Sequence, residues 1–428
     1  MEQKSCWRKA AAVTGALLCL LPVSALAQAP LEETAAPLSL DVLVRDALEQ
    51  NPGVQAAARR VGALRRRVPQ AQSLPDPVLS VGWMGDSKPF GVMRDDPSSY
   101  RALSAMQEIP YPGKLRLRGQ LADREAEAAW WDYEAARRQV VAEMKDAYYE
   151  YSFARTALEI TRKNQDLLEK LAKIAETRYR VGRGLQQDVL KAHVELSRLR
   201  QRLTVLEQQA RTAQVRLNTL RARDPEAPLG PPAALEPVEL TYLLETLYQL
   251  ARENDTGLRR EEQRIARQQV AVSLARKEFY PDFGVGYMYQ NRPLLPEMHG
   301  FTVSLNIPVF YKSKQREGVN EATEELLGAR RSRDDRETTL NFEVKEQFLV
   351  ARASQELYRL YSQAIVPQSS LALESALAAY EVGSVDFLTV IESFSTVLDF
   401  EVDYYRELAN YLTALARLEP LTGVELTK

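Results

Sequence analysis

The chain repeats itself, and the repeat is the feature that most limits how it can fold. Three short motifs recur in the same order about 200 residues later. They are Tyr179-Arg180-Val181-Gly182 with Tyr380-Glu381-Val382-Gly383, Pro75-Asp76 with Pro281-Asp282, and Ile109-Pro110 with Ile307-Pro308. The period is far longer than the 20–50 residues of solenoid repeats. We therefore expect a duplicated chain, with the same series of elements in each half around an approximate two-fold axis.

The first 27 residues have the three parts of a secretory signal peptide. These are the basic residues Lys4, Arg8 and Lys9, the apolar run 10–21, and the small-residue cleavage motif 25–27. The apolar run is too short to span a bilayer as a helix. We therefore expect residues 1–27 to be removed and the rest of the chain to be exported.

Composition excludes several classes of function. Cys6 and Cys19 both lie in the signal peptide, so no disulfide or thiolate metal site is expected in the mature chain. Cleavage also removes three basic residues and one acid, which changes the formal net charge from −2 to −4. Such a balance does not favour nucleic-acid binding. No later segment has 18 consecutive apolar residues, so we expect no transmembrane helix.

Long helices are predicted in the first half. Residues 114–178 contain no proline and only one glycine, and strong helix formers dominate them. A break at Val181–Gly184 separates them from a second helix over 185–221. The apolar residues of that second helix are spaced alternately by three and four, which indicates lengthwise packing on neighbouring helices.

The second half repeats this pattern over 314–379 and 387–418, with a break at Val382-Gly383. Pro367 should kink or break the first of these helices, since proline lacks an amide hydrogen. Each half is thus predicted to hold a helical hairpin with a glycine turn at its tip. The five prolines between Arg223 and Pro237 indicate a linker between the halves.

Four segments before the hairpins alternate between apolar and polar or small residues. They lie near 79–84, 103–109, 284–289 and 301–307, and we interpret them as strands in two hairpins, so that each half contains helix, strand, strand, helix and helix. One interpretation is two surface hairpins on a helical core. The other is a membrane barrel, which requires several chains because four strands cannot close one. Trp83, Tyr287, Tyr289 and Phe301 would then lie at the membrane interface, with ordinary sheet packing as the alternative.

These strand hairpins closed by Ile-Pro, the long helices and the two Tyr-x-Val-Gly turns resemble the TolC-like outer membrane factors, over roughly residues 38–420. The segment Gln107-Glu108-Ile109-Pro110-Tyr111-Pro112-Gly113-Lys114-Leu115 looks most like the heavy-metal efflux branch. The resemblance implies a mainly α fold with a small β part: a homotrimer with a 12-stranded outer-membrane β-barrel and a periplasmic α-barrel tunnel. The expected regions are the signal peptide 1–27, a first repeat 28–222, a Pro-rich linker 223–237 and a second repeat 238–428.

By the same resemblance, the protein would be the outer-membrane duct of a tripartite efflux pump, embedded in outer-membrane lipid of a Gram-negative bacterium and extending far into the periplasm. Its partners would be a periplasmic adaptor and an inner-membrane transporter of the resistance-nodulation-division type. The cargo would include heavy-metal cations. Alternatives are the outer channel of a type I protein-secretion system, a periplasmic coiled-coil adaptor, and a purely structural helical protein.

The resemblance also assigns roles at the hairpin tips. Asp188 and Glu392 would line the periplasmic mouth of the tunnel as rings of carboxylates, which attract cations in pores generally. Thr389 occupies a further position that is acidic in the family. Asp188 has an alternative role in capping its helix. The residues expected to dock the adaptor are Tyr179, Val181, Gly182, Arg183, Tyr380, Val382, Gly383 and Ser384.

The sequence offers little chemistry. His193 and His299 lie far apart, and no catalytic constellation or phosphate-binding loop is visible. We therefore expect no enzyme activity, no cofactor and no metal site. Five methionines fall in the strand and loop regions: Met84, Met93, Met106, Met288 and Met298. They are interpreted as filling barrel and loop positions, with a path for a soft metal as the alternative.

Overall fold

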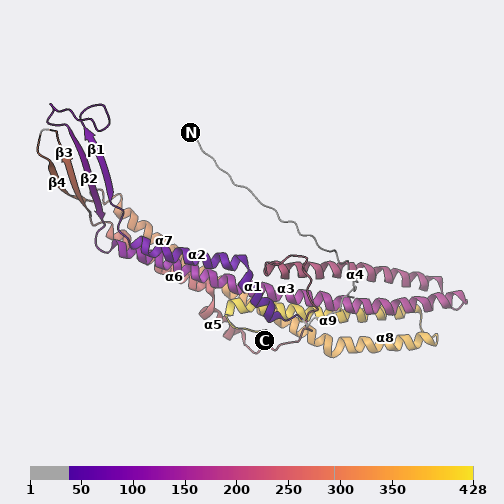
Figure 1. The fold of residues 1–428 in the computed structure, drawn as a ribbon. Coiled ribbons are helices and arrows are strands. Elements are labelled where there is room, and N and C mark those ends of the chain that lie inside the picture. The colour runs from indigo at the N-terminus through magenta and orange to yellow at the C-terminus, as the bar shows by residue number, and fades with distance from the viewer. Residues whose placement is uncertain (1–37, 294, 428) are drawn as a thin grey trace, which may run out of the picture. The chain divides into compact units, whose positions relative to one another are not determined.

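The computed structural model describes residues 38–293 and 295–427, so the predicted signal peptide lies outside the described residues. Figure 1 shows the fold. The first half contains α1 (Leu40–Gln50), α2 (Pro52–Gln72), β1 (Val78–Met84), β2 (Tyr100–Ile109), α3 (Lys114–Arg180) and α4 (Gln186–Leu220). The second contains α5 (Leu244–Asn254), α6 (Thr256–Lys277), β3 (Asp282–Asn291), β4 (Met298–Asn306), α7 (Gln315–Leu360), η1 (Tyr361–Ile365), α8 (Val366–Glu381) and α9 (Phe387–Thr422). The same series recurs, which confirms the internal repeat and the mainly helical fold; the exact repeat boundaries stay a prediction.

Each half begins with two helices, where the sequence predicted one. Asn51 ends α1 and caps α2, because its side chain accepts hydrogen bonds from the amides of Gly53 and Val54. Pro52 disfavours a helical conformation at Asn51, which places the break there. In the second half Asp255 does the same for α6 by accepting from the amide of Leu258 at 2.7 Å.

The four strands form one antiparallel sheet in the order β1-β2-β3-β4. The pairing of β2 with β3 joins the two halves, with Ala105 opposite Tyr287. Tyr287 in turn lies opposite Phe301. Among the described residues, β1 and β4 each pair on one side only, so the sheet has two open edges.

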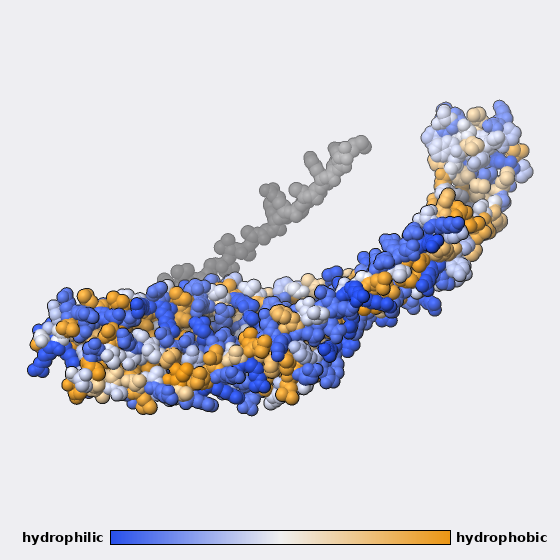
Figure 2. Space-filling view, turned by 180° about the vertical axis from the view of Figure 1, so that it is seen from behind, coloured by the Kyte–Doolittle hydropathy of each residue, from blue (hydrophilic) through white to orange (hydrophobic). Residues whose placement is uncertain are grey.

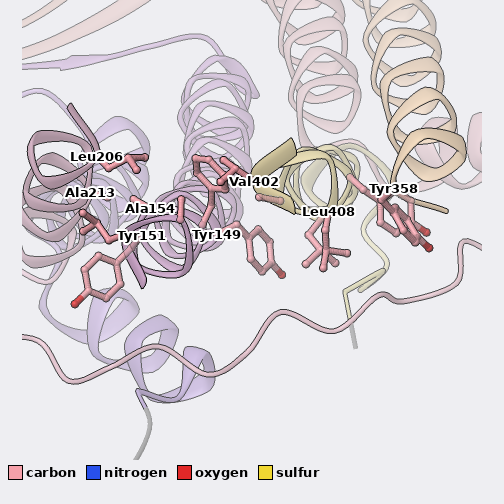
Figure 3. Packing of buried hydrophobic residues seen from close by; sticks show 14 of the residues in the cluster. Tyr149, Tyr151, Ala154, Leu206, Ala213, Tyr358, Val402 and Leu408 are labelled. Atoms are coloured by element: carbon pink, nitrogen blue, oxygen red, sulfur yellow. The ribbon is translucent and has the colours of Figure 1, made fainter. Parts of the chain in front are cut away.

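Small side chains let the long helices pack closely. Ala147, Ala154 and Ala157 of α3 are buried against neighbouring helices, and α3 contacts both α4 and α9. Figure 3 shows the core where Tyr149, Tyr151 and Ala154 of α3 meet residues of the other helices. Those labelled partners are Leu206 and Ala213 of α4, Val402 and Leu408 of α9, and Tyr358 of α7. The predicted seam of α4 packs on the core, with Leu203 alone of its residues only partly buried. The α3–α9 contact joins the two halves.

Pro367 interrupts the regular α-helix, as the sequence predicted. The helix widens into the five-residue π-turn η1 just before it, and the Val366 amide donates to the carbonyl of Tyr361, five residues back. Proline cannot donate a backbone hydrogen bond, and its ring would clash with the carbonyl one turn earlier. The extra residue in the turn relieves that conflict, so the helical path is interrupted without being ended.

The stretch that contains the predicted linker has no helix or regular strand. This stretch lies against α3, where the amide of Ala233 donates a hydrogen bond to the hydroxyl of Tyr148 at 3.1 Å.

Figure 1 places the sheet at one end of the helices and the α3–α4 and α8–α9 turns at the other. In Figure 2 apolar side chains gather where the sheet meets the helices, and exposed residues of this region include Ile307, Val309 and Phe310. Among the described residues, no helix is both long and apolar enough to cross a membrane.

Candidate functional site

The two hairpin tips have the same backbone. Gly182 after α3 has φ 70°, and Gly383 after α8 has φ 78°. The Arg183 amide donates to the carbonyl of Arg178 at 2.8 Å, and the Ser384 amide to that of Ala379 at 2.9 Å. A left-handed residue combined with such a bond across six residues is the Schellman arrangement, in which glycine is favoured because it has no Cβ. The predicted glycine turns are therefore confirmed.

The tips expose apolar side chains to solvent. Val181 is 63% exposed and Val382 is 80% exposed. Gly182, Arg183, Gly383 and Ser384 lie beside them, and all six residues are exposed. These residues therefore form one end surface, and their role in docking an adaptor stays a prediction.

The two tip tyrosines hold matching positions in the repeated motif but differ in exposure. Tyr179 is 46% exposed, whereas Tyr380 is 7% exposed. The Tyr380 ring packs 5.5 Å from that of Phe387 at the start of α9. The first hairpin has Gln186 as the first residue of α4, so it offers no ring for Tyr179 to pack on. Tyr380 therefore belongs to the packing of the tip and Tyr179 to its surface.

Arg178 links the hairpins, a role that was not predicted from the sequence. Its guanidinium donates to the carbonyls of Tyr380 at 3.1 Å and Glu381 at 3.2 Å. These carbonyls end α8, where a cation is favoured by the helix dipole. Its place beside Tyr179 in the repeated motif was visible, but its partners lie about 200 residues away and follow only from the packing.

Asp188 lies in the first turn of α4, where its carboxylate accepts the Leu185 amide at 3.4 Å. A first-turn acid is stabilised by the helix dipole. Asp188 also lies near the opposite hairpin. Burial raises the pKa of Tyr380, and the negative charge of Asp188 raises that pKa further while Arg178 lowers it.

Thr389 takes the corresponding first-turn position in α9, and Asp386 caps that helix. The Asp386 carboxylate accepts from the Thr389 amide at 3.0 Å and from its hydroxyl at 2.7 Å. These two hydrogen bonds lower the pKa of Asp386. This cap was not predicted, although an aspartate immediately before an apolar helix is a recognised helix-start signal.

Glu392 is exposed and lies one turn further along α9. Within residues 38–293 and 295–427, no hydrogen bond or ion pair joins it to Asp188. The structure therefore puts Asp188, Asp386 and Glu392 at the same end of the helices without bringing them into one cluster. Carboxylates that are not joined in one cluster can still act on ions through their charge where they surround a pore.

The predicted interface aromatics share one face of the sheet. Tyr287 lies opposite Phe301, and Tyr289 and Trp83 follow in the next rows toward the β1–β2 and β3–β4 loops. Phe301 is 83% exposed. This face also carries Leu79, Val81 and Val303, whereas the opposite face carries Ser80, Ser104, Gly286 and Thr302. One face is thus suited to an apolar environment and the other to water, and the interface role stays a prediction.

The two histidines lie apart. His193 of α4 has its Nε2 3.3 Å from a carboxylate oxygen of Glu176 on α3, and both side chains are exposed. His299 lies in the sheet with its Nδ1 2.7 Å from the Tyr287 hydroxyl. In the part of the chain that the structure describes, no group of three or more His, Cys, Asp or Glu is placed to hold a metal ion.

A family model described as "Outer membrane efflux protein" matches residues 43–222 and 247–424. The cobalt-zinc-cadmium resistance protein CzcC of Cupriavidus metallidurans is 22% identical over 400 residues, which cover 91% of each chain. Two solved structures share the fold. The Campylobacter jejuni CmeC outer membrane channel has a TM-score of 0.77 at 16% identity, covering 91% of this chain and 87% of that one. The Vibrio cholerae outer membrane protein VceC has 0.75 at 17%, covering 90% and 96%.

Proposed function

This chain belongs to the outer membrane efflux protein family, and we propose that it forms, as a homotrimer, the outer-membrane duct of a tripartite efflux pump. The observation that carries the proposal is the sheet. It has two open edges, one apolar face and one small, polar face, and it is joined to helices far longer than it is. An exposed strand edge is unfavourable in water and prohibitive in lipid, so the sheet requires partners at both edges.

Copies of the same chain satisfy that requirement. If β4 of one copy pairs with β1 of the next, three copies supply twelve strands, enough for a closed barrel. Exposed Leu79, Val81 and Phe301 then face lipid, and Ser80 and Thr302 face the lumen. Tyr287 and Tyr289 are suited to the interface, where aromatic residues are enriched. The helices of three copies would form the periplasmic tunnel.

The exposed tips favour an end-to-end contact with a periplasmic adaptor. Val181 and Val382 offer apolar area, and a Cβ built on Gly182 or Gly383 meets nothing within 4 Å, so another backbone can approach closely. An adaptor held there would connect the duct to an inner-membrane transporter of the resistance-nodulation-division type. Asp188 and Glu392 would then act on ions near the mouth, with Thr389 as a neutral position beside them.

We propose a passive duct that needs no cofactor and has no catalytic centre, exporting heavy-metal cations. The likeness to a cobalt-zinc-cadmium resistance protein over 91% of both chains supports this cargo. The carboxylates of Asp188, Asp386 and Glu392 would attract cations if they surround the mouth of the duct. The proposed organisation keeps two repeats, 28–222 and 238–428, around the linker 223–237.

Fractionation and conductance of the full-length protein test the duct. We expect it in the outer membrane, as a trimer in mild detergent that dissociates on heating, and as a channel in planar bilayers. A monomer that leaves bilayers non-conducting would overturn the proposal. Deletion of the gene should lower tolerance to at least one of cobalt, zinc, cadmium, copper and silver. Unchanged tolerance to all five metals would overturn the cargo and leave the duct standing.

A further inference from the structure

Four methionines lie on the polar face of the sheet. Ser80, Ser104, Met288 and Gly300 form one row across the four strands, on the face opposite Tyr287 and Phe301. In the row toward the helices, Met106 lies between Val78 and Gly286; in the row toward the loops, Met298 lies opposite Gln290. Met84 lies one row further on β1. In the proposed barrel this face lines the lumen.

Three of these methionines form a diagonal line. From Met106 on β2 to Met288 on β3, and from Met288 to Met298 on β4, each step moves one strand across and two residues along. Diagonal neighbours on one face of an antiparallel pair are about 7–8 Å apart at the backbone, within reach of long side chains. The line therefore climbs from the helix side of the sheet toward its loops.

Two of the side chains extend across to the next strand. The Cε of Met106 lies 3.6 Å from the position of a Cβ on Gly286, and Gly286 precedes Met288 by two residues on the same face. The Cε of Met288 likewise lies 3.5 Å from that position on Gly300, two residues from Met298. The thioethers of Met106 and Met288 thus extend over a bare glycine of the next strand, two residues from the next methionine. The amide of Gln290 also approaches the Met288 sulfur at 3.6 Å.

These thioethers are not core filling. Met106 is 44% exposed and Met298 is 46% exposed, whereas Met144 in the helical core is 0% exposed. A thioether is a soft ligand, which selects soft cations such as Cu(I) over hard ones. We propose that Met106, Met288 and Met298 form a relay of weak binding sites for soft monovalent cations, Cu(I) or Ag(I), along the lumen face of the sheet.

The relay rests on the proposed function, because it needs the polar face to line a pore. Several weak sites in series suit conduction, since an ion must bind well enough to enter and weakly enough to leave. No redox step is involved: the cation moves between sulfur lone pairs as a monovalent ion. The chemistry of the sites favours soft cations, and divalent zinc, which prefers nitrogen, oxygen and thiolate ligands, should bypass them.

Silver is the probe, because Ag(I) is soft and stays monovalent in air. The full-length protein, labelled with ¹³C at its methionine ε-methyl groups and purified in detergent, is titrated with silver nitrate in chloride-free buffer. We expect the methyl signals of Met106, Met288 and Met298, assigned with single Met→Leu variants, to shift at lower silver concentrations than that of Met93. Met93 is the matched control, since it is 48% exposed but lies in the β1–β2 loop. Zinc should shift none of them.

In equilibrium dialysis, the triple variant M106L/M288L/M298L should retain about one third or less of the silver that wild type retains. Met93→Leu should retain as much silver as wild type. Equal silver retention by the triple variant, or methyl signals that respond no more than that of Met93, would overturn the relay. The triple variant should still form trimers and conduct in bilayers. A wild-type protein that neither trimerises nor conducts would instead overturn the proposed duct, whatever its silver binding.

Discussion

The guanidinium of Arg178 on α3 lies 4.2 Å from the centre of the Tyr380 ring on α8. The same side chain donates to the carbonyls that end α8. Because α3 belongs to the first repeat and α8 to the second, this contact ties together two hairpins that the turn sequences alone present as equivalent. Any motion that separates the tips must break it.

Replacing Arg178 with alanine should loosen the tips. The change removes the ring contact and two charge-assisted hydrogen bonds, which we expect to cost about 1–2 kcal/mol at this half-buried site. Cysteines at Val181 and Val382, spin-labelled in the otherwise cysteine-free mature chain, should report a broader distance distribution. Arg180→Ala is the matched control, since Arg180 is exposed in the same turn. Equal distributions for both variants would exclude Arg178 as a link.

Neutralising the tip acids should weaken block by divalent cations. Asp188→Asn with Glu392→Gln removes two charges per chain, and the asparagine oxygen can still accept the Leu185 amide. Single-channel recording in bilayers would measure the concentration of divalent cation needed for half block, which we expect to rise several-fold.

Adding a negative charge at the tips gives a second test of the proposed mouth. Lys191 holds in α4 the position that Glu392 holds in α9, each being the sixth residue of its helix. Lys191→Glu should therefore strengthen the block. If neither the neutralised variant nor Lys191→Glu changes it, the assignment of the tips as an ion-sensing mouth fails.

Bulk at the tip glycines should prevent docking of an adaptor. A side chain added at Gly182 or Gly383 projects into open space, and the positive φ costs about 1–2 kcal/mol. Gly182→Trp and Gly383→Trp should leave the trimer intact and lower both adaptor pull-down and efflux. Asparagine tolerates positive φ, so Gly182→Asn is the control that keeps the turn with little bulk. Unchanged pull-down and efflux by the tryptophan variants would refute end-to-end docking.

The cap of α9 should persist in an acidified periplasm. Hydrogen bonds from Thr389 lower the pKa of Asp386, so the stabilisation is present above the unfolded-state pKa of about 3.8 and is lost as pH falls through the folded value. Hydrogen exchange of residues 385–392, corrected for intrinsic rates, should show protection that is constant from pH 7 to pH 5. Asp386→Ala should lower protection at every pH, and a wild-type loss above pH 5 would contradict this account.

The sequence predicted the parts of the fold that depend on local pattern. Heptad spacing gave the buried seam of α4, and the paired Tyr-x-Val-Gly motifs gave two turns whose positive φ requires glycine. Pro367 marked the π-turn because its effect on the helix is local. The contact of Arg178 with Tyr380 was not predictable, because it depends on how two distant hairpins pack.

The repeat is imperfect at the tips. Phe387 replaces Gln186 as the first residue of the returning helix and draws Tyr380 into the interior. The burial of Lys114 was not predicted either. A lysine after a glycine turn is normally exposed, and only the approach of the second half surrounds this one with acceptors.

Lys114 should hold the sheet to the helices. It is 1% exposed, and its Nζ lies 2.9 Å from Asp282, 3.0 Å from Glu278 and 3.2 Å from the carbonyl of Tyr280. Asp282 also accepts the Tyr111 amide at 2.7 Å. These bonds join the start of α3 to the segment that leads from α6 into β3, so both halves meet at this ammonium group.

Lys114→Met should therefore lower the melting temperature of the trimer markedly. It leaves carboxylates without their cation, and breaking a buried pair costs about 3–5 kcal/mol, with the lower end expected because Glu278 is partly exposed. Adding Asp282→Asn should restore part of the loss, since asparagine still accepts the Tyr111 amide and carries no charge. Lys277→Met is the control, because the Lys277 ammonium lies over the rings of Tyr111 and Tyr280, at 5.1 and 5.4 Å, and has no ion pair among the described residues. A melting temperature for Lys114→Met no lower than that of Lys277→Met would show that the junction does not depend on this lysine.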